Sequence, residues 1–186
     1  MVRRRATRLR AYDYSQPGAY FVTICSHRRD PIFGTLHERS IKLNRAGQIV
    51  TTWWRLLPYR YPRITLDEFV VMPDHIHAIV IISDLAHSSV GEIHEFPLRV
   101  EPESPTLPDI TAVKSETRIA RRRMILPLVI GYFKMNTAKA INGFRTTPGV
   151  PVWQRSYYER IIRNQIELNQ VREYILNNPL ALDLDI

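Results

Sequence analysis

The chain is poor in cysteine and contains no long hydrophobic run. Cys25 is its only cysteine, which excludes an internal disulfide and a cysteine-rich zinc site. No segment reaches the ~18 consecutive apolar residues that a membrane span requires, and the basic N-terminus lacks the apolar core of a signal peptide. We therefore expect a cytoplasmic protein with no membrane partner. Cys25 lies in an apolar run, so we expect its side chain to be buried.

What is present is the composition of a globular protein. Hydrophobic residues make up 45% and charged residues 24% of the 186 residues, enough for a sizeable core in one domain. Segment 83–123 contains several prolines and little periodicity, which is unusual inside a compact domain. We therefore predict a single domain over residues 1–186, with an insertion or mobile loop at 83–123.

The charge balance favours a polyanionic partner. The formal net charge is +8, and arginine, which binds phosphate in bidentate fashion and stacks on bases, dominates over lysine in the basic clusters. The alternative interpretation is an ordinary solvated surface with a basic tail. The clusters are Arg3, Arg4, Arg5, Arg8 and Arg10 near the N-terminus, Arg121 to Arg123, and Arg155, Arg160, Arg163 and Arg172 near the C-terminus.

Hydrophobic patterning predicts a mixture of strands and helices. Strands are expected at 20–24, 64–72, 75–82 and 152–162, with a short hairpin at 32–43. Helices are expected from Asn44 to about Leu57, ended by Pro58 and Pro62, at 126–144, and at 165–178, ended by Pro179. The turn at Pro73–Asp74 is too short for anything but an antiparallel pair of its flanking strands. The fold class predicted is α+β, a ferredoxin-like antiparallel sheet flanked by helices.

Two histidines form the most informative motif. His75 and His77 are two residues apart on a predicted strand, so both imidazoles project from the same face and can share one metal ion. Two ligands are too few for a structural zinc site and suit an open catalytic ion whose vacant positions are filled by substrate. The alternative is a pair of histidines at a strand start with no ligand function.

A tyrosine and an asparagine are neighbours on the last predicted helix. Tyr174 lies about 90° from the stripe of Leu168, Val171 and Ile175, where its hydroxyl can meet both solvent and an adjacent site. Asn178 is one turn further on and therefore beside Tyr174. A boundary tyrosine followed by a helix-terminating Asn–Pro pair is the alternative interpretation.

Residues 152–164 (VWQRSYYERIIRN) interleave aromatic and basic side chains. That pattern is typical of surfaces that hold unpaired bases and their phosphates, and it also fits an amphipathic strand with a solvated basic face. The candidate DNA-binding residues here are Trp153, Arg155, Arg160 and Arg163.

Together, and in this order, MPDHIH (72–77), VWQRSYYERIIRN (152–164) and YILNNP (174–179) resemble the REP-associated tyrosine transposases. These are single-tyrosine HUH nucleases related to insertion-sequence transposases, and the resemblance covers about residues 15–82 and 125–182. It implies that Tyr174 is the nucleophile and that His75, His77 and Asn178 bind a divalent ion, Mg or Mn. It further implies a single-stranded or hairpin DNA substrate. Relatives include monomers and homodimers.

The reaction expected is attack of the Tyr174 phenol on a DNA phosphate, giving a 5′-phosphotyrosine and a free 3′-hydroxyl. Tyr157 and Tyr158 are rival nucleophiles, with no Asn or Gln four residues on. Two other functions stay open at this point. One is a domesticated protein that binds hairpins without cutting them, and the other is a metal-dependent phosphoesterase that uses water.

Overall fold

The computed structural model describes residues 16–37, 40–84 and 124–181. The predicted insertion at 83–123 falls almost entirely outside these residues, as do Arg3, Arg4, Arg5, Arg8 and Arg10. None of the described helices is long and apolar enough to cross a membrane.

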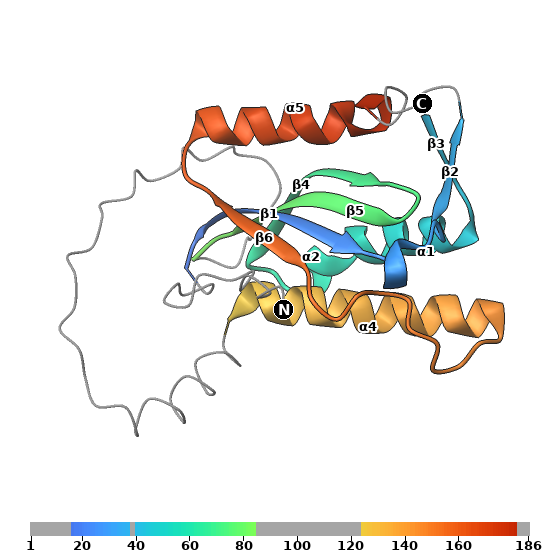
Figure 1. The fold of residues 1–186 in the computed structure, drawn as a ribbon. Helices are drawn as coiled ribbons and strands as arrows, with labels where there is room; N and C mark the ends of the chain where they lie inside the picture. The colour runs from blue at the N-terminus through green and yellow to red at the C-terminus, as the bar shows by residue number, and fades with distance from the viewer. Residues whose placement is uncertain (1–15, 38–39, 85–123, 182–186) are drawn as a thin grey trace, which may run out of the picture.

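A four-stranded antiparallel sheet forms the centre of the molecule, in the order β4-β5-β1-β6 (Figure 1). Its strands are rich in β-branched and aromatic residues, which fit a pleated, buried surface. Read along the chain with α1 and α4, the elements follow the β-α-β-β-α-β order of the ferredoxin-like fold, which confirms the predicted fold class. The strands are β1 (Gly18–Cys25), β4 (Ile64–Val71), β5 (His75–Ile82) and β6 (Tyr158–Ile162).

Helices cover both faces of this sheet (Figure 1). On one face pack α1 (Arg45–Arg55) and α4 (Ile125–Arg145), and on the other lies α5 (Gln165–Ala181). Because side chains alternate along a strand, Ile76, Ala78 and Val80 of β5 enter the core under α1 and α4. Ile79 enters the smaller core under α5. His75 and His77 share the parity of Ile79 and so face α5.

A short hairpin and a capped helix follow β1. The hairpin strands β2 (Gly34–His37) and β3 (Ser40–Leu43) pair antiparallel, as predicted. Asn44 caps α1, because its Oδ1 accepts the amides of Ala46 at 2.9 Å and Gly47 at 3.1 Å. The short elements η1 (His27–Arg29) and α2 (Leu57–Arg60) complete the described chain.

Prolines behave differently from the prediction at two helix ends. Pro58 does not end α1 but lies in the first turn of α2, where its missing N–H costs nothing and its fixed φ is favourable. Pro179 lies inside α5, which continues to Ala181, so the predicted stop at Asn178 is wrong.

The strand predicted at 152–162 is also too long. Only Tyr158–Ile162 joins the sheet, and Trp153 forms an isolated bridge with Ser26. Lys134 of α4 donates to the carbonyls of Gln154 at 2.5 Å and Arg155 at 3.1 Å, so these groups bond to a side chain instead of a neighbouring strand. Cys25 is only partly buried.

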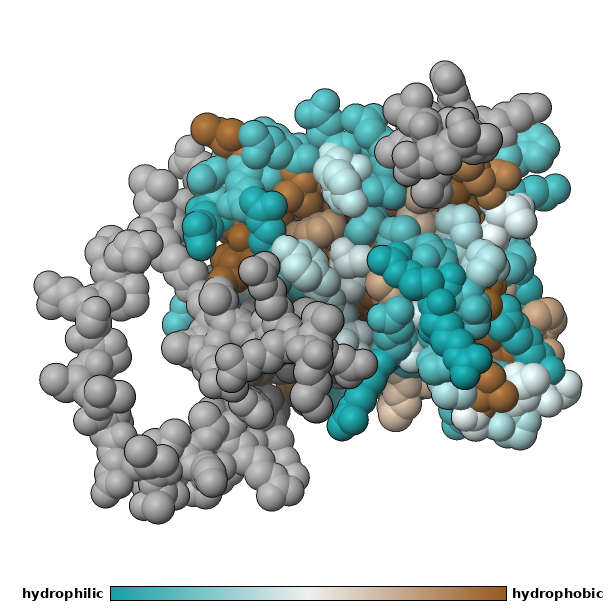
Figure 2. Space-filling model, in the orientation of Figure 1, coloured by the Kyte–Doolittle hydropathy of each residue, from teal (hydrophilic) through white to brown (hydrophobic). Residues whose placement is uncertain are grey.

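Hydrophilic side chains dominate the face seen in Figure 2, with hydrophobic residues scattered between them and no single large apolar patch. Surfaces of this kind are ordinary for a folded domain. The predicted histidines and Tyr174 lie between the sheet and α5.

Candidate active site

The two predicted histidines meet at the start of β5. Their Nε2 atoms are 3.0 Å apart and their rings cross at 78°. Both side chains are well covered: the His75 side chain is 12% exposed, and His77 is buried beneath α5. The expectation that both imidazoles share one face is confirmed.

Tyr174 of α5 reaches this pair. Its Oη lies 3.4 Å from His77 Nε2, and the two rings are 5.3 Å apart. Phe21 of β1 stacks on His77 and meets Tyr174 edge to face. Tyr174 is nevertheless 51% exposed, so its ring is held by neighbours while remaining open to a large partner.

Each histidine is oriented by a second side chain through its other ring nitrogen. His75 Nδ1 lies 2.5 Å from Asp74 Oδ1, and His77 Nδ1 lies 2.8 Å from Thr23 Oγ1. A carboxylate only accepts, so the contact with Asp74 requires a proton on His75 Nδ1, and in the neutral ring this places the lone pair on Nε2. A hydroxyl both donates and accepts, so Thr23 is compatible with either tautomer of His77.

His77 is held in its neutral form. Burial, the neighbouring His75 and the guanidinium of Arg29 lower the pKa of His77 from 6.5 to about 3, against the opposing effect of Asp74. A neutral imidazole is the form that binds a metal ion. His77 is therefore available as a nitrogen donor throughout the physiological range.

The donor set fits one divalent ion. Among the described residues, no group of three or more His, Cys, Asp or Glu side chains is arranged to hold a metal. Asn178 is the described side chain of another type that is a candidate third ligand. The two Nε2 atoms are 3.0 Å apart. Adjacent ligand atoms of an octahedral ion have about this spacing when each lies about 2.1 Å from the ion. Two imidazoles and an amide oxygen leave further positions for water and substrate.

Asn178 is the amide in question. It is 9% exposed, and its side chain has no hydrogen-bond partner among the described residues. Arg172 binds Asp67 of β4, whose neighbour Leu66 is in register with Val80, and Tyr174 contacts His77. Helix α5 therefore runs in the direction from Val80 toward His75. Asn178, one turn after Tyr174, lies on the His75 side.

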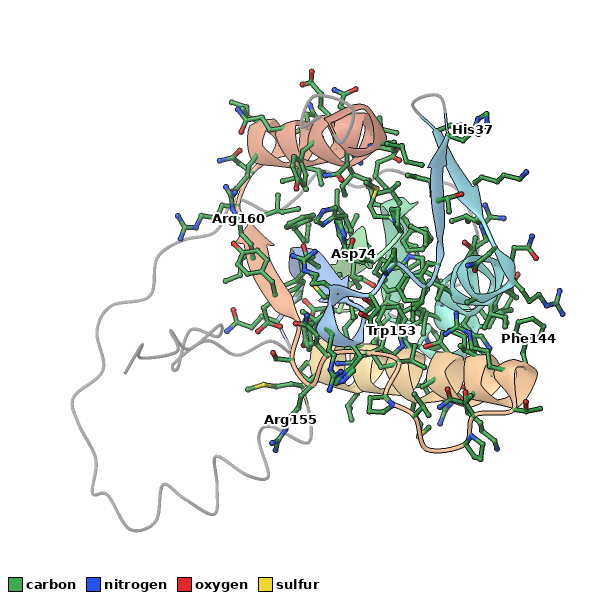
Figure 3. All side chains as sticks on the ribbon, turned by 45° about the vertical axis from the view of Figure 1, so that its right-hand side comes forward. His37, Asp74, Phe144, Trp153, Arg155 and Arg160 are labelled. Carbon is green, nitrogen blue, oxygen red and sulfur yellow. The ribbon has the colours of Figure 1, made fainter. Side chains whose placement is uncertain are left out.

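The predicted DNA-binding residues of segment 152–164 are not brought together. Trp153 is buried between Phe33 and Phe133, and its Nε1 donates to Thr137 at 2.8 Å. Its assignment as a base-binding residue is therefore wrong, because the ring belongs to the core beneath α4. Figure 3 shows Arg155 projecting beside α4, while Arg160 lies on β6 near α5.

The remaining arginines and rival tyrosines are placed as follows. Arg160 forms an ion pair with Glu167, and the Arg163 side chain is exposed. Tyr157 is buried in the larger core. Tyr158 is 48% exposed and meets Phe21 edge to face, so it lies on the face of the histidines, but no contact joins it to them.

Sequence reasoning missed Thr23, Asp74 and Arg29 as parts of the site. Asp74 directly precedes His75 and was interpreted only as a turn residue, although a carboxylate next to a candidate ligand is a signal for an orienting partner. Thr23 gave no signal, because it contacts His77 across the sheet through the pairing of β1 with β5.

No protein-family model matches the chain. It is 32% identical over 182 residues, 98% of this chain and 91% of the other, to an uncharacterized protein of Haemophilus influenzae.

Two solved structures are similar at low identity. The structure of a REP-associated tyrosine transposase bound to a REP hairpin is 18% identical with a TM-score of 0.48, covering 94% of this chain and 73% of that one. The crystal structure of a transposase candidate from Deinococcus radiodurans is 13% identical with a TM-score of 0.43, covering 91% and 95%.

Proposed function

We propose that this chain, which belongs to the same family as the uncharacterized Haemophilus influenzae protein, is a transposase-like enzyme that cleaves and rejoins single-stranded DNA. The observation that carries the proposal is the contact of Tyr174 with the histidine pair. A half-exposed phenol lies 3.4 Å from one of two imidazole nitrogens that are 3.0 Å from each other. A nucleophile and a pair of metal donors are thereby combined at one surface.

The covalent step uses Tyr174 alone. Its Oη attacks the phosphorus, the bond from phosphorus to the 3′-oxygen breaks, and the phenolic proton passes through solvent to the departing oxygen. The products are a 5′-phosphotyrosine and a free 3′-hydroxyl. Because the phosphodiester energy is kept in the tyrosyl ester, a second 3′-hydroxyl can attack it and restore both a DNA strand and Tyr174.

His75, His77 and Asn178 would hold a divalent ion, Mg or Mn. Such an ion would polarise the scissile phosphate and lower the barrier to attack by a phenol whose ordinary pKa is ~10. The protein's own contribution is to orient both imidazoles, through Asp74 on His75 and Thr23 on His77. The low pKa of His77 favours this donor role over storage of the phenolic proton.

The substrate proposed is hairpin-bearing single-stranded DNA. The three motifs of the sequence resemblance support it, and the half-exposed Tyr174 suits a strand that is not enclosed by a partner strand. A net charge of +8 would attract the phosphates of such a substrate.

The proposal is tested by trapping the protein on DNA. The full chain is incubated with end-labelled oligonucleotides that carry a hairpin and single-stranded flanks, in the presence of Mn, and resolved on a denaturing gel. The expected result is a covalent protein–DNA band that is absent with Tyr174→Phe and with His75→Ala. Tyr158→Phe is the matched control, because Tyr158 is similarly exposed and on the same face of the sheet.

Three outcomes would redirect the proposal. Binding without a covalent band, across hairpins of varied sequence, would favour a protein that binds DNA without cutting it. Cleavage without a covalent band would favour a phosphoesterase using water. A band that persists in Tyr174→Phe and disappears in Tyr158→Phe would move the nucleophile to β6.

A further inference from the structure

The turn after β1 contains two consecutive residues with left-handed backbone. Arg28 and Arg29 have φ angles of 57° and 64°. Residues other than glycine, asparagine and aspartate rarely adopt this backbone region. Backbone strain of this kind persists only where the surroundings fix it, and it gathers at functional sites. The two arginines of this turn are therefore candidates for a functional role.

Hydrogen bonds fix the turn to the strand that carries the histidines. The amide of Ser26 donates to the carbonyl of Asp74 at 2.8 Å, and its buried hydroxyl donates to the carbonyl of Asp30 at 2.8 Å. The amide of His27 donates to the carbonyl of Val152 at 2.8 Å. The turn is thus anchored on both sides, and Arg29 is directed over the first residues of β5.

The guanidinium of Arg29 is only partly engaged there. Its Nη1 lies 3.2 Å from Asp74 Oδ2 and 3.4 Å from His75 Nδ1, and its side chain is 54% exposed. Within the described residues its Nη2 and Nε groups have no partner. A guanidinium offers five donors in a planar fork that matches phosphate oxygens, and most of this fork faces solvent.

The position of Arg29 relative to His75 decides which phosphate it can reach. Arg29 Nη1 lies beside Nδ1 of His75, whereas Nε2 of the same ring faces His77, which Tyr174 contacts. Arg29 therefore borders the ring nitrogen of His75 that does not face the tyrosine–histidine contact. We propose that Arg29 binds the neighbouring backbone phosphate of the same strand, an inference that rests on the proposed function.

A purely structural role is the alternative. Arg29 could act only through Asp74, holding the carboxylate that orients His75. In that case removing the guanidinium would disturb the histidine pair, but the DNA would lose no contact of its own. The two roles differ in whether one particular phosphate stops contributing to binding.

The experiment is a binding series in the full-length Tyr174→Phe protein, which separates binding from chemistry. Hairpin-bearing oligonucleotides are made with one neutral methylphosphonate at each successive position of the single-stranded part. The affinity of each is measured for the Tyr174→Phe background and with Arg29→Gln, Arg29→Lys or Arg28→Gln added. Arg28→Gln is the matched control, because it makes the same charge change in the same turn, at an exposed side chain.

We expect one position at which the methylphosphonate weakens binding roughly 10-fold in the background and has no effect with Arg29→Gln. Arg29→Gln should itself bind the unmodified DNA roughly 10-fold more weakly and lower the slope of log affinity against log salt by about 0.7, the value for one phosphate on a single strand. Arg29→Lys should restore part of the affinity, and Arg28→Gln should leave the profile unchanged.

If every methylphosphonate that weakens binding in the background also weakens it with Arg29→Gln, the proposal is overturned and the structural role is favoured. In a second outcome, Arg29→Gln abolishes the effect of the methylphosphonate at one position, but the protein that keeps Tyr174 forms no covalent band with DNA. This result would support the Arg29 contact and reject the proposed cleavage. Absence of binding in every protein would reject both.

Discussion

His77 is the central residue of the candidate site, and Thr23 is its partner on the neighbouring strand. The Thr23 hydroxyl at 2.8 Å from Nδ1 holds the ring while its Nε2 faces His75 and Tyr174. We predict that Thr23→Val lowers the affinity for Mn by roughly 10- to 100-fold, because the buried Nδ1 proton would lose its acceptor. The Mn affinity is measured by titrating the protein with Mn and following the electron paramagnetic resonance signal of the free ion.

Valine keeps the β-branched shape of threonine, so the strand should be retained. Thr65→Val on β4 is the matched control, since that side chain is exposed on a strand of the same sheet. Equal Mn affinity in the two variants would mean that Thr23 does not orient a metal donor.

The low pKa of His77 predicts a specific dependence of stability on pH. The unfolded chain takes up a proton on this residue near pH 6.5, whereas the folded chain does so only at about 3. Between these values the unfolded state binds more protons, so falling pH destabilises the fold, by at most about 1.4 kcal/mol per pH unit from this group. Above pH 6.5 the residue contributes no pH dependence.

His77→Gln should remove that slope. Urea unfolding of both proteins in chelator, at intervals from pH 7 to pH 4, gives the difference in unfolding free energy between wild type and variant. The wild type should lose stability relative to the variant as the pH falls below 6.5. Parallel curves would show that His77 is protonated equally easily in both states.

At the residue scale, local patterns predicted some site residues and misassigned others. Alternation along β5 was enough to place His75 and His77 on one face, and helical spacing was enough to place Tyr174 at the edge of the α5 stripe. Trp153 was misassigned because an aromatic residue among arginines has the same pattern whether a helix covers it or not. Only the packing of α4 decides that its indole faces Phe33 and Thr137.

Helix α5 carries Tyr174, so its attachment to the sheet controls the site. Leu168, Val171 and Ile175 bury its apolar stripe, and Arg172 binds both oxygens of Asp67 at 2.9 and 2.6 Å. Burial alone would raise the pKa of Asp67, but hydrogen bonds from Arg172 and the Glu68 amide hold it below its usual value. The ion pair therefore fixes the helix two residues before Tyr174, close to the tyrosine–histidine contact.

We predict that Arg172→Met lowers the unfolding free energy by about 1–2 kcal/mol, a figure reduced for the partial exposure of the arginine. The rate of covalent adduct formation should fall as well, while DNA affinity changes little, because the loosened helix no longer holds Tyr174 against His77. A double-mutant cycle with Asp67→Asn checks the cause. Additive losses in stability would show that the pair does not couple α5 to β4.

The capping of α1 is a second element with a measurable cost. Asn44 Oδ1 accepts two amides, and its Nδ2 donates to the carbonyl of Ile32 at 3.0 Å. Asn44→Ala should lower the unfolding free energy by about 1–2 kcal/mol in urea denaturation, and Asn44→Asp should lose less because it keeps the acceptor. No loss in Asn44→Ala would mean that solvent replaces the cap.

At the element scale, the existence of elements was more predictable than their ends. The apolar, β-branched runs of β1, β4 and β5 were predicted as strands and form strands, although the pairing of β4 with β5 is interrupted between Leu66 and Phe69. The end of the strand at 158–162 depended on a tertiary contact, because Lys134 donates to the carbonyls at 154–156, which a local sequence window does not show. The end of α5 was misjudged because Pro179 lies within its last residues and the helix runs on to Ala181.

For the whole molecule, the excess of positive charge sets how DNA affinity responds to salt. The net charge is +8, and five of the arginines lie among the first ten residues. Each phosphate neutralised on a single strand contributes about 0.7 to the slope of log affinity against log salt. If these five arginines contact phosphates, replacing them with glutamine should lower that slope by up to about 3.5.

The prediction is specific to binding. Arg3, Arg4, Arg5, Arg8 and Arg10 are changed together to glutamine, and affinity for the hairpin oligonucleotide is measured from low to high salt. At saturating DNA the rate of covalent adduct formation should match that of the unchanged protein, because the proposed nucleophile Tyr174 and the histidine pair are left unaltered. A shallower salt dependence with an unchanged saturating rate would assign the arm to phosphate tracking. An unchanged slope would instead place the DNA contacts on other basic residues of the chain.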